Sequence, residues 1–287
     1  MKKYFILLIA TIIVSGSKPI ITTYDLKTAI DRKIVTCKFN GNIDSPHYYQ
    51  PLLIDITNLT NKEVKIRIPN GQKFITDSTD TQDVIITQEE LIALSPNKNK
   101  NRSLYAMCIQ ENKAASNEGT SFILGEIAKG NLIEITNEIE KTKSFNTIGQ
   151  YSVWSITDKF PLDEIEGFNE KEANHYQKYL ANLLNVEIPT VETESYKNYY
   201  EATRTLQRSV VGKFEYNIHN QANITIGLFN EQNIIVRELY NNPNQKAGEH
   251  LFKYAFDATT YQDPRYYIRL IIDGNIKVSL KMEPKKP

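Results

Sequence analysis

The sequence predicts an α+β N-terminal domain with a β-sandwich-like core and about three helices, followed by an all-β immunoglobulin-like sandwich. Short stretches of β-branched and alternating residues occur at both ends of the chain, and helical spacing of apolar residues is confined to the middle. Such segregation of strands and helices is typical of α+β proteins. With 40% hydrophobic and 24% charged residues among 287, the chain can bury a core, and its length fits two domains.

Short strands dominate the first half of the chain. In residues 63–68, Val64, Ile66 and Ile68 alternate with charged residues, which predicts a strand buried on one face. Further strands are predicted from β-branched runs bounded by turn residues. They cover residues 34–39, 52–57, 74–75, 83–86 and 103–109, with a polar loop at residues 95–101.

Three amphipathic helices are predicted after these strands. Residues 127–141 place Ile127, Leu132, Ile135 and Ile139 close to helical spacing. Residues 148–157 surround the single tryptophan, Trp154, and residues 170–185 predict a third helix. The buried face of the third helix is expected to consist of Ala173, Tyr176, Leu180, Leu183 and Leu184. These elements complete an α+β domain over residues 18–186.

The last part of the chain returns to strands after a polar stretch. Residues 187–208 contain Pro189 and many Thr, Glu and Tyr residues, which predicts a linker. An all-β domain is predicted for residues 209–284, with a turn at Asp273-Gly274-Asn275. Its six strands are expected at residues 213–218, 222–229, 234–240, 251–256, 265–272 and 277–282.

The first 17 residues predict export. Lys2 and Lys3 precede an apolar run over residues 4–14, and Ser15, Gly16 and Ser17 follow, which is the order of a cleavable secretory signal. The alternative is an uncleaved anchor, but a spanning helix needs about 20 apolar residues. We therefore expect a secreted or cell-envelope protein, in the periplasm or on the outer surface, with no stable transmembrane segment after cleavage.

Charge and motifs exclude several functions. The 34 basic and 34 acidic residues balance, so a nucleic-acid partner is not expected. The four histidines lie far apart without ligand spacing, and no nucleophile elbow, phosphate loop or zinc-protease motif occurs. Acidic pairs such as Glu89-Glu90 are more typical of a solvated surface than of a glycosidase. We predict no catalytic residue, no cofactor and no metal.

Two cysteines leave two alternatives open. In an exported protein Cys37 and Cys108 could form a disulfide, which requires their Cα atoms to come within about 7 Å. The other alternative is a pair of buried free thiols.

The C-terminal part carries a resemblance to a known fold. Its strands read FEYNI from Phe214, NITIGLFNEQNIIVREL from Asn223, KAGEHLFKYAFD from Lys246 and RYYIRLIIDGNIKVSLKM from Arg265. This order resembles the immunoglobulin-like modules of the flagellar hook-capping protein and of the secretion-system C-terminal domains of exported Bacteroidetes proteins. The resemblance implies an immunoglobulin-like sandwich in a cell-envelope protein. The chain departs from the sorting-signal pattern at Asp263-Pro264 and in its ending, EPKKP.

A looser resemblance involves the first domain. A turn at residues 69–71, the strand ending AMC at residues 106–108 and the helix motif QYSVW at residues 150–154 resemble uncharacterised bacterial secreted domains. The last two elements are also similar to thioester domains of surface adhesins. That resemblance implies a bond between Cys108, or Cys37, and Gln150, shielded by Trp154, which would capture a host amine. The alternative for Trp154 is a purely structural place in the core.

These observations predict an exported, non-enzymatic protein that acts by binding a surface or envelope ligand, either protein or glycan. The alternative is a covalent adhesin with an internal Cys-Gln thioester.

Overall fold

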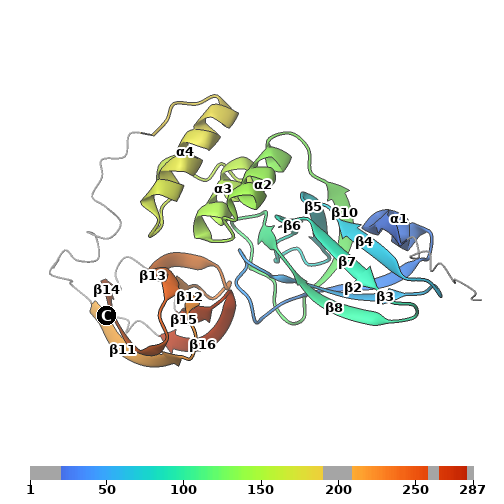
Figure 1. Cartoon of the computed structure of the whole chain (residues 1–287). Coiled ribbons are helices and arrows are strands. Elements are labelled where there is room, and N and C mark those ends of the chain that lie inside the picture. Colours follow the sequence, from blue (N-terminus) through green and yellow to red (C-terminus); the bar gives the residue numbers. More distant parts are fainter. Residues whose placement is uncertain (1–20, 190–208, 258–264, 283–287) are drawn as a thin grey trace, which may run out of the picture.

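The computed structural model describes residues 21–189, 209–257 and 265–282 (Figure 1). The described residues form a β-rich α+β fold with four α-helices and several sheets, which confirms the predicted class at this level. The predicted signal at residues 1–17 and most of the predicted linker at residues 187–208 lie outside the described residues.

The first part of the chain is built on two sheets. A seven-stranded sheet has the order β8-β3-β2-β10-β5-β6-β9, and a three-stranded sheet has the order β1-β4-β7. Alternation buries Val64, Ile66 and Ile68 on one face of β4, as predicted. The strands are β1 (Thr22–Asp25), β2 (Val35–Gly41), β3 (Leu52–Asn58), β4 (Val64–Ile68), β5 (Gln72–Thr76), β6 (Val84–Ile86), β7 (Glu90–Leu94), β8 (Asn99–Leu104), β9 (Ala106–Cys108) and β10 (Ser121–Ile127).

Three predicted elements have wrong boundaries. The strand predicted at residues 103–109 is two strands, β8 and β9, separated by Tyr105, and the loop predicted at residues 95–101 ends earlier because β8 begins at Asn99. The helix predicted from residue 127 begins only after Gly130, whose φ of 61° and ψ of −143° suit glycine alone. Residues up to Ile127 belong to β10 instead.

Three helices form a layer beside the seven-stranded sheet. They are α2 (Asn131–Thr142), α3 (Thr147–Thr157) and α4 (Glu170–Leu184), which lie side by side in Figure 1, while the short α1 (Leu26–Asp31) follows β1. Trp154, Ile135 and Tyr176 are buried in this part of the core. The helices predicted at residues 148–157 and 170–185 are confirmed.

The second part of the chain is a small β-sandwich. A two-stranded sheet, β11-β14, faces a four-stranded sheet, β13-β12-β15-β16, across a core that includes Ile226, Ile268 and Leu270. All six predicted strands occur. They are β11 (Ser209–Ile218), β12 (Ala222–Phe229), β13 (Ile235–Gln245), β14 (Gly248–Asp257), β15 (Tyr266–Ile272) and β16 (Asn275–Met282). Asp273 and Gly274, with φ of 48° and 75°, form the tight turn between β15 and β16.

The two parts meet through the loop that joins β2 to β3. The Ser45 hydroxyl donates to the carbonyl of Gly274 at 2.9 Å, and the Ile276 N–H donates to the carbonyl of Asp44 at 2.9 Å. Beside these bonds Tyr48 packs in a buried apolar cluster with Phe229 and other residues of the second part. The contact is therefore both apolar and hydrogen-bonded.

His47 is the buried centre of this contact. Its Nε2 accepts the backbone N–H of Ile235 at 3.1 Å, which places the imidazole proton on Nδ1. The ring stacks on Trp154, with centroids 5.7 Å apart and planes 16° from parallel. Burial lowers the pKa of His47 to about 3, the Gln150 side chain partly opposes this, and the charge of Arg269 lowers it further. The neutral imidazole thus joins α3 to β13.

Replacing His47 tests how much this contact contributes. The change His47→Ala leaves the Ile235 N–H buried without an acceptor and removes the stacking on Trp154, so we expect a loss of about 2 to 4 kcal/mol in the free energy of unfolding. Urea denaturation followed by tryptophan fluorescence measures it. His219→Ala is the matched control, because His219 is exposed and should change stability by less than about 0.5 kcal/mol. Equal effects of the two changes would contradict a structural role for His47.

Candidate functional site

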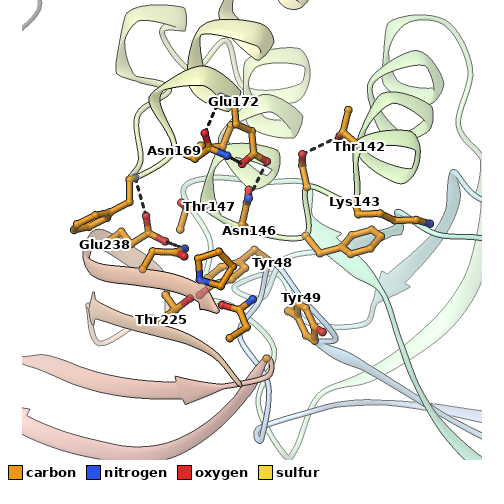
Figure 2. Close-up of a pocket in the computed structure, with 18 of the residues that line it drawn as sticks. Tyr48, Tyr49, Thr142, Lys143, Asn146, Thr147, Asn169, Glu172, Thr225 and Glu238 are labelled. Atoms are coloured by element: carbon orange, nitrogen blue, oxygen red, sulfur yellow. Dashed lines mark hydrogen bonds between the residues drawn. The ribbon is translucent and has the colours of Figure 1, made fainter. Parts of the chain in front are cut away.

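A cleft of about 860 Å³ with polar and apolar lining residues lies where the two parts of the chain meet (Figure 2). The α2–α3 connection and the start of α4 form one side, and the neighbouring strands β12 and β13 form the other. Tyr48 and Tyr49, from the loop that joins the two parts, also line it. Clefts at such junctions are common ligand sites in proteins.

Two helix N-termini meet at one carboxylate in this cleft. Asn146 caps α3 and Asn169 caps α4, each accepting a backbone N–H in the first turn. Both amides also donate to Glu172, from Asn146 Nδ2 at 2.9 Å and from Asn169 Nδ2 at 3.0 Å (Figure 2). Glu172 therefore holds the starts of the two helices together, and its negative charge suits their dipoles.

A second carboxylate, Glu238, is buried on the opposite side. One oxygen accepts the Phe168 N–H at 3.2 Å, and the other accepts the side-chain amide of Asn241 at 2.7 Å. Burial raises the pKa of Glu238 to about 7, these two hydrogen bonds oppose the rise, and the charge of Glu172 adds to it. Glu238 fastens β13 to the residues just before α4, and its charge changes near neutral pH.

Other polar side chains of the cleft keep unused hydrogen-bonding groups. Within the described part of the chain, the hydroxyls of Thr147 and Thr225 and the side-chain amide of Asn223 have no hydrogen-bond partner, although all three residues line the cleft. Figure 2 shows Thr147 and Thr225 on opposite sides of the space. Lys143, Lys171 and His175 are the basic groups of the lining. The cleft thus offers hydroxyl and amide groups to a ligand. Its basic side chains are accompanied by two carboxylates, Glu172 and Glu238.

Cys108 and Gln150, the residues predicted for a thioester, are in contact, but the Gln150 side chain meets the backbone of Cys108 and not its sulfur. Gln150 accepts the Cys108 N–H at 3.0 Å and donates to the Cys108 carbonyl at 2.8 Å. Cys108 belongs to β9, the last strand of its sheet, and this bidentate contact supplies the partner that a next strand would give. Trp154 is buried beside them with 2% of its surface exposed and packs against His47. Gln150 and Trp154 thereby have structural roles.

The two cysteines are free thiols, so the structure favours the second of the two alternatives rather than the disulfide. Cys37 lies in β2 and Cys108 in β9, with β10, β5 and β6 between them in the sheet order. Burial raises the pKa of the Cys37 thiol to about 12 and raises that of Cys108 still further, so both stay protonated at neutral pH.

The acidic pair Glu89-Glu90 does not line the cleft, and Glu89 forms an ion pair with Arg67. A further carboxylate outside the lining, Glu138, forms ion pairs with Lys141 and His175. Among the described residues, no group of three His, Cys, Asp or Glu side chains is arranged to hold a metal ion. No helix in the described ranges has the length and apolar character needed to cross a membrane.

Sequence reasoning missed the cleft, because its residues come from distant segments of the chain. One local signal was present: Asn169 followed three residues later by Glu172 is a helix-start pattern of the capping-box type. Comparisons with protein families, with curated protein sequences and with solved structures find no match to the chain.

The titration of Glu238 gives a prediction with a definite sign. Its pKa is raised from 4.5 in the unfolded chain to about 7 in the folded one, so the folded state binds more protons between these values. Stability contributed by this group is therefore full below pH 4.5 and is lost as pH rises through 7. The loss is at most about 3 kcal/mol, since one pKa unit corresponds to about 1.4 kcal/mol.

The change Glu238→Gln should remove this dependence. The difference in free energy of unfolding between variant and wild type, measured by urea titration from pH 4.5 to pH 8, should shift in favour of the variant as pH rises. His47 has the opposite effect, because its lowered pKa makes stability fall as pH drops below 6.5. Since His47 is present in both proteins, its contribution cancels when the free energy of the wild type is subtracted from that of the variant. A pH-independent difference would contradict the assignment.

Proposed function

We propose that the chain is an exported, non-enzymatic binding protein of the cell envelope, and that its cleft binds a glycan. The proposal depends on the unused polar groups of the cleft, with Thr147 of α3 on one side and Asn223 and Thr225 of β12 on the other. Sugar hydroxyls act as both donors and acceptors, so they match side-chain amides and hydroxyls. The export signal and the immunoglobulin-like character of the sandwich belong to this proposal and rest on the sequence.

The aromatic residues of the lining support a glycan over a charged ligand. Tyr49 and Phe168 supply apolar faces, and the two lysines of the lining are balanced by Glu172 and Glu238. A highly charged ligand would meet like charge on one side or the other. A neutral saccharide can use the apolar faces and the hydrogen-bonding groups together.

The carboxylates support binding rather than hydrolysis. Each oxygen of Glu172 accepts a hydrogen bond from an asparagine amide, and each oxygen of Glu238 accepts one from Phe168 or Asn241. Groups fixed in this way hold the walls of the cleft in place. A glycosidase needs one acid and one carboxylate directed at the scissile bond.

The alternative function, a covalent adhesin, has less support. A thioester joins the sulfur of Cys108 to the side-chain carbonyl carbon of Gln150 with loss of ammonia. Here the Gln150 oxygen and nitrogen both bond to the Cys108 backbone. The intact mass of the purified protein separates the two functions: an unshifted mass is expected, and loss of one ammonia would favour the adhesin.

Binding is tested with a glycan array followed by titration calorimetry with the best soluble oligosaccharide. Thr225→Val removes one hydroxyl at nearly constant volume and should weaken binding about tenfold, the value of one hydrogen bond. Thr147→Val should act similarly. Thr23→Val, at an exposed residue of β1 away from the cleft, is the matched control and should leave affinity unchanged.

Two results would contradict the proposal. One is the absence of any glycan bound with a dissociation constant below about 1 mM. The other is equal weakening by the cleft variants and the Thr23→Val control. Chromatography of the oligosaccharide after incubation should recover it intact, and cleavage would contradict the non-enzymatic part.

A further inference from the structure

The strands β2 and β10 separate after a short contact. β2 pairs with β3 along its whole length, from Val35 to Gly41, but its ladder with β10 holds only two residue pairs, Asn40 with Ser121 and Phe39 with Phe122. Within the described residues no other strand pairs with this side of β2. The rest of β2 thus has one open edge in the middle of a seven-stranded sheet.

β10 also contains a bulge, just beyond its contact with β2. The register between β10 and β5 shifts between Leu124 and Ile127. The side chain of Gln72 holds the bulge, donating to the carbonyl of Gly125 at 2.7 Å and to that of Lys73 at 3.1 Å. Bulges bend the strand that contains them. β10 stays paired with β5 on both sides of the bulge, whereas its ladder with β2 ends at Phe122.

The hydrogen bonds of β2 show which of its backbone groups point toward the open edge. The Gly41 N–H donates to Thr120 across the β10 side, whereas the Ile34 carbonyl accepts from Leu59 on the β3 side. Because successive residues of a strand point their backbone groups to opposite sides, the N–H and C=O of Val35 and Cys37 point toward β10. Those of Thr36 and Lys38 point toward β3.

The space between the strands is a groove of about 670 Å³. Residues 35–40 of β2 and residues 121–124 of β10 line it, and the apolar ones among them are Val35, Cys37, Phe39, Phe122, Ile123 and Leu124. Among the residues that the structure describes, Lys33 and Lys38 are the charged residues of the lining. The groove therefore combines an apolar surface, positive charge and unpaired strand backbone.

We propose that this groove binds an extended peptide segment of a partner protein, which adds a strand along β2. Backbone hydrogen bonds to Val35 and Cys37 would provide affinity, and alternate apolar side chains would enter the groove. Acidic side chains on the segment would face Lys33 and Lys38. An acyl chain fits the apolar surface but leaves the strand backbone unpaired, so the peptide is the better match.

Hydrogen exchange measured by NMR on the full chain tests the proposal directly. The probe is a synthetic eight-residue peptide that alternates valine with glutamate or threonine. On binding, the amides of Val35 and Cys37 should exchange at least about tenfold more slowly. The amides of Thr36 and Lys38, which already face β3, serve as internal references and should not change.

A chemical control separates strand addition from simple apolar contact. The same peptide N-methylated at alternate residues keeps every side chain but loses its backbone donors, and it should not protect Val35 or Cys37. The variant Lys38→Glu should weaken binding of the acidic peptide several-fold through charge reversal. Lys253→Glu, at an exposed residue of β14, is its matched control.

Three outcomes would overturn the proposal. The first is unchanged exchange of Val35 and Cys37 at about 1 mM peptide. The second is equal protection by the N-methylated peptide. The third is protection of these amides without peptide: if it persists on dilution, another segment of this chain covers the edge, and if it fades, a second copy does. Glycan binding in the cleft is measured separately, so the two proposals can fail independently.

Discussion

The neutral imidazole of His47 is the interaction on which the arrangement of the molecule depends. On one side it accepts the Ile235 N–H of the sandwich, and on the other it stacks on Trp154 of α3. Next to it, Gln150 completes the backbone pairing of Cys108 at the edge of the seven-stranded sheet. One buried histidine thus links a helix, a sheet edge and the second part of the chain. A charged imidazole could not accept the Ile235 proton at Nε2, which is why burial and neutrality go together here.

The cleft exists because of this contact. The loop that carries His47 also places Tyr48 and Tyr49 in the cleft, and the docked sandwich brings Thr225 and Glu238 opposite the starts of α3 and α4. Glu238 then fastens β13 to the residues before α4. The proposed binding site is therefore a product of docking, and neither part of the chain forms it alone. The groove beside β2 has a different origin, since it lies within one sheet, between two strands that pair over only two residues.

Local patterns predicted much of the fold. Alternation located β4, turn residues separated the six C-terminal strands, and helical spacing located α3 and α4. The junction could not be predicted, because the loop around His47 has no periodicity and its partner Ile235 lies 188 residues away. The motifs singled out Gln150 and Cys108 for a thioester, yet residue types do not tell which atoms meet. Their contact through backbone groups required the structure.

Calorimetric unfolding of the full chain tests the role of the junction most directly. If the contact around His47 joins the two parts, both should unfold in one cooperative transition, with the calorimetric enthalpy equal to the van't Hoff enthalpy. Two resolved transitions, with the sandwich melting separately from the part that contains Trp154, would show that the parts are independent and that the contact does not determine the arrangement.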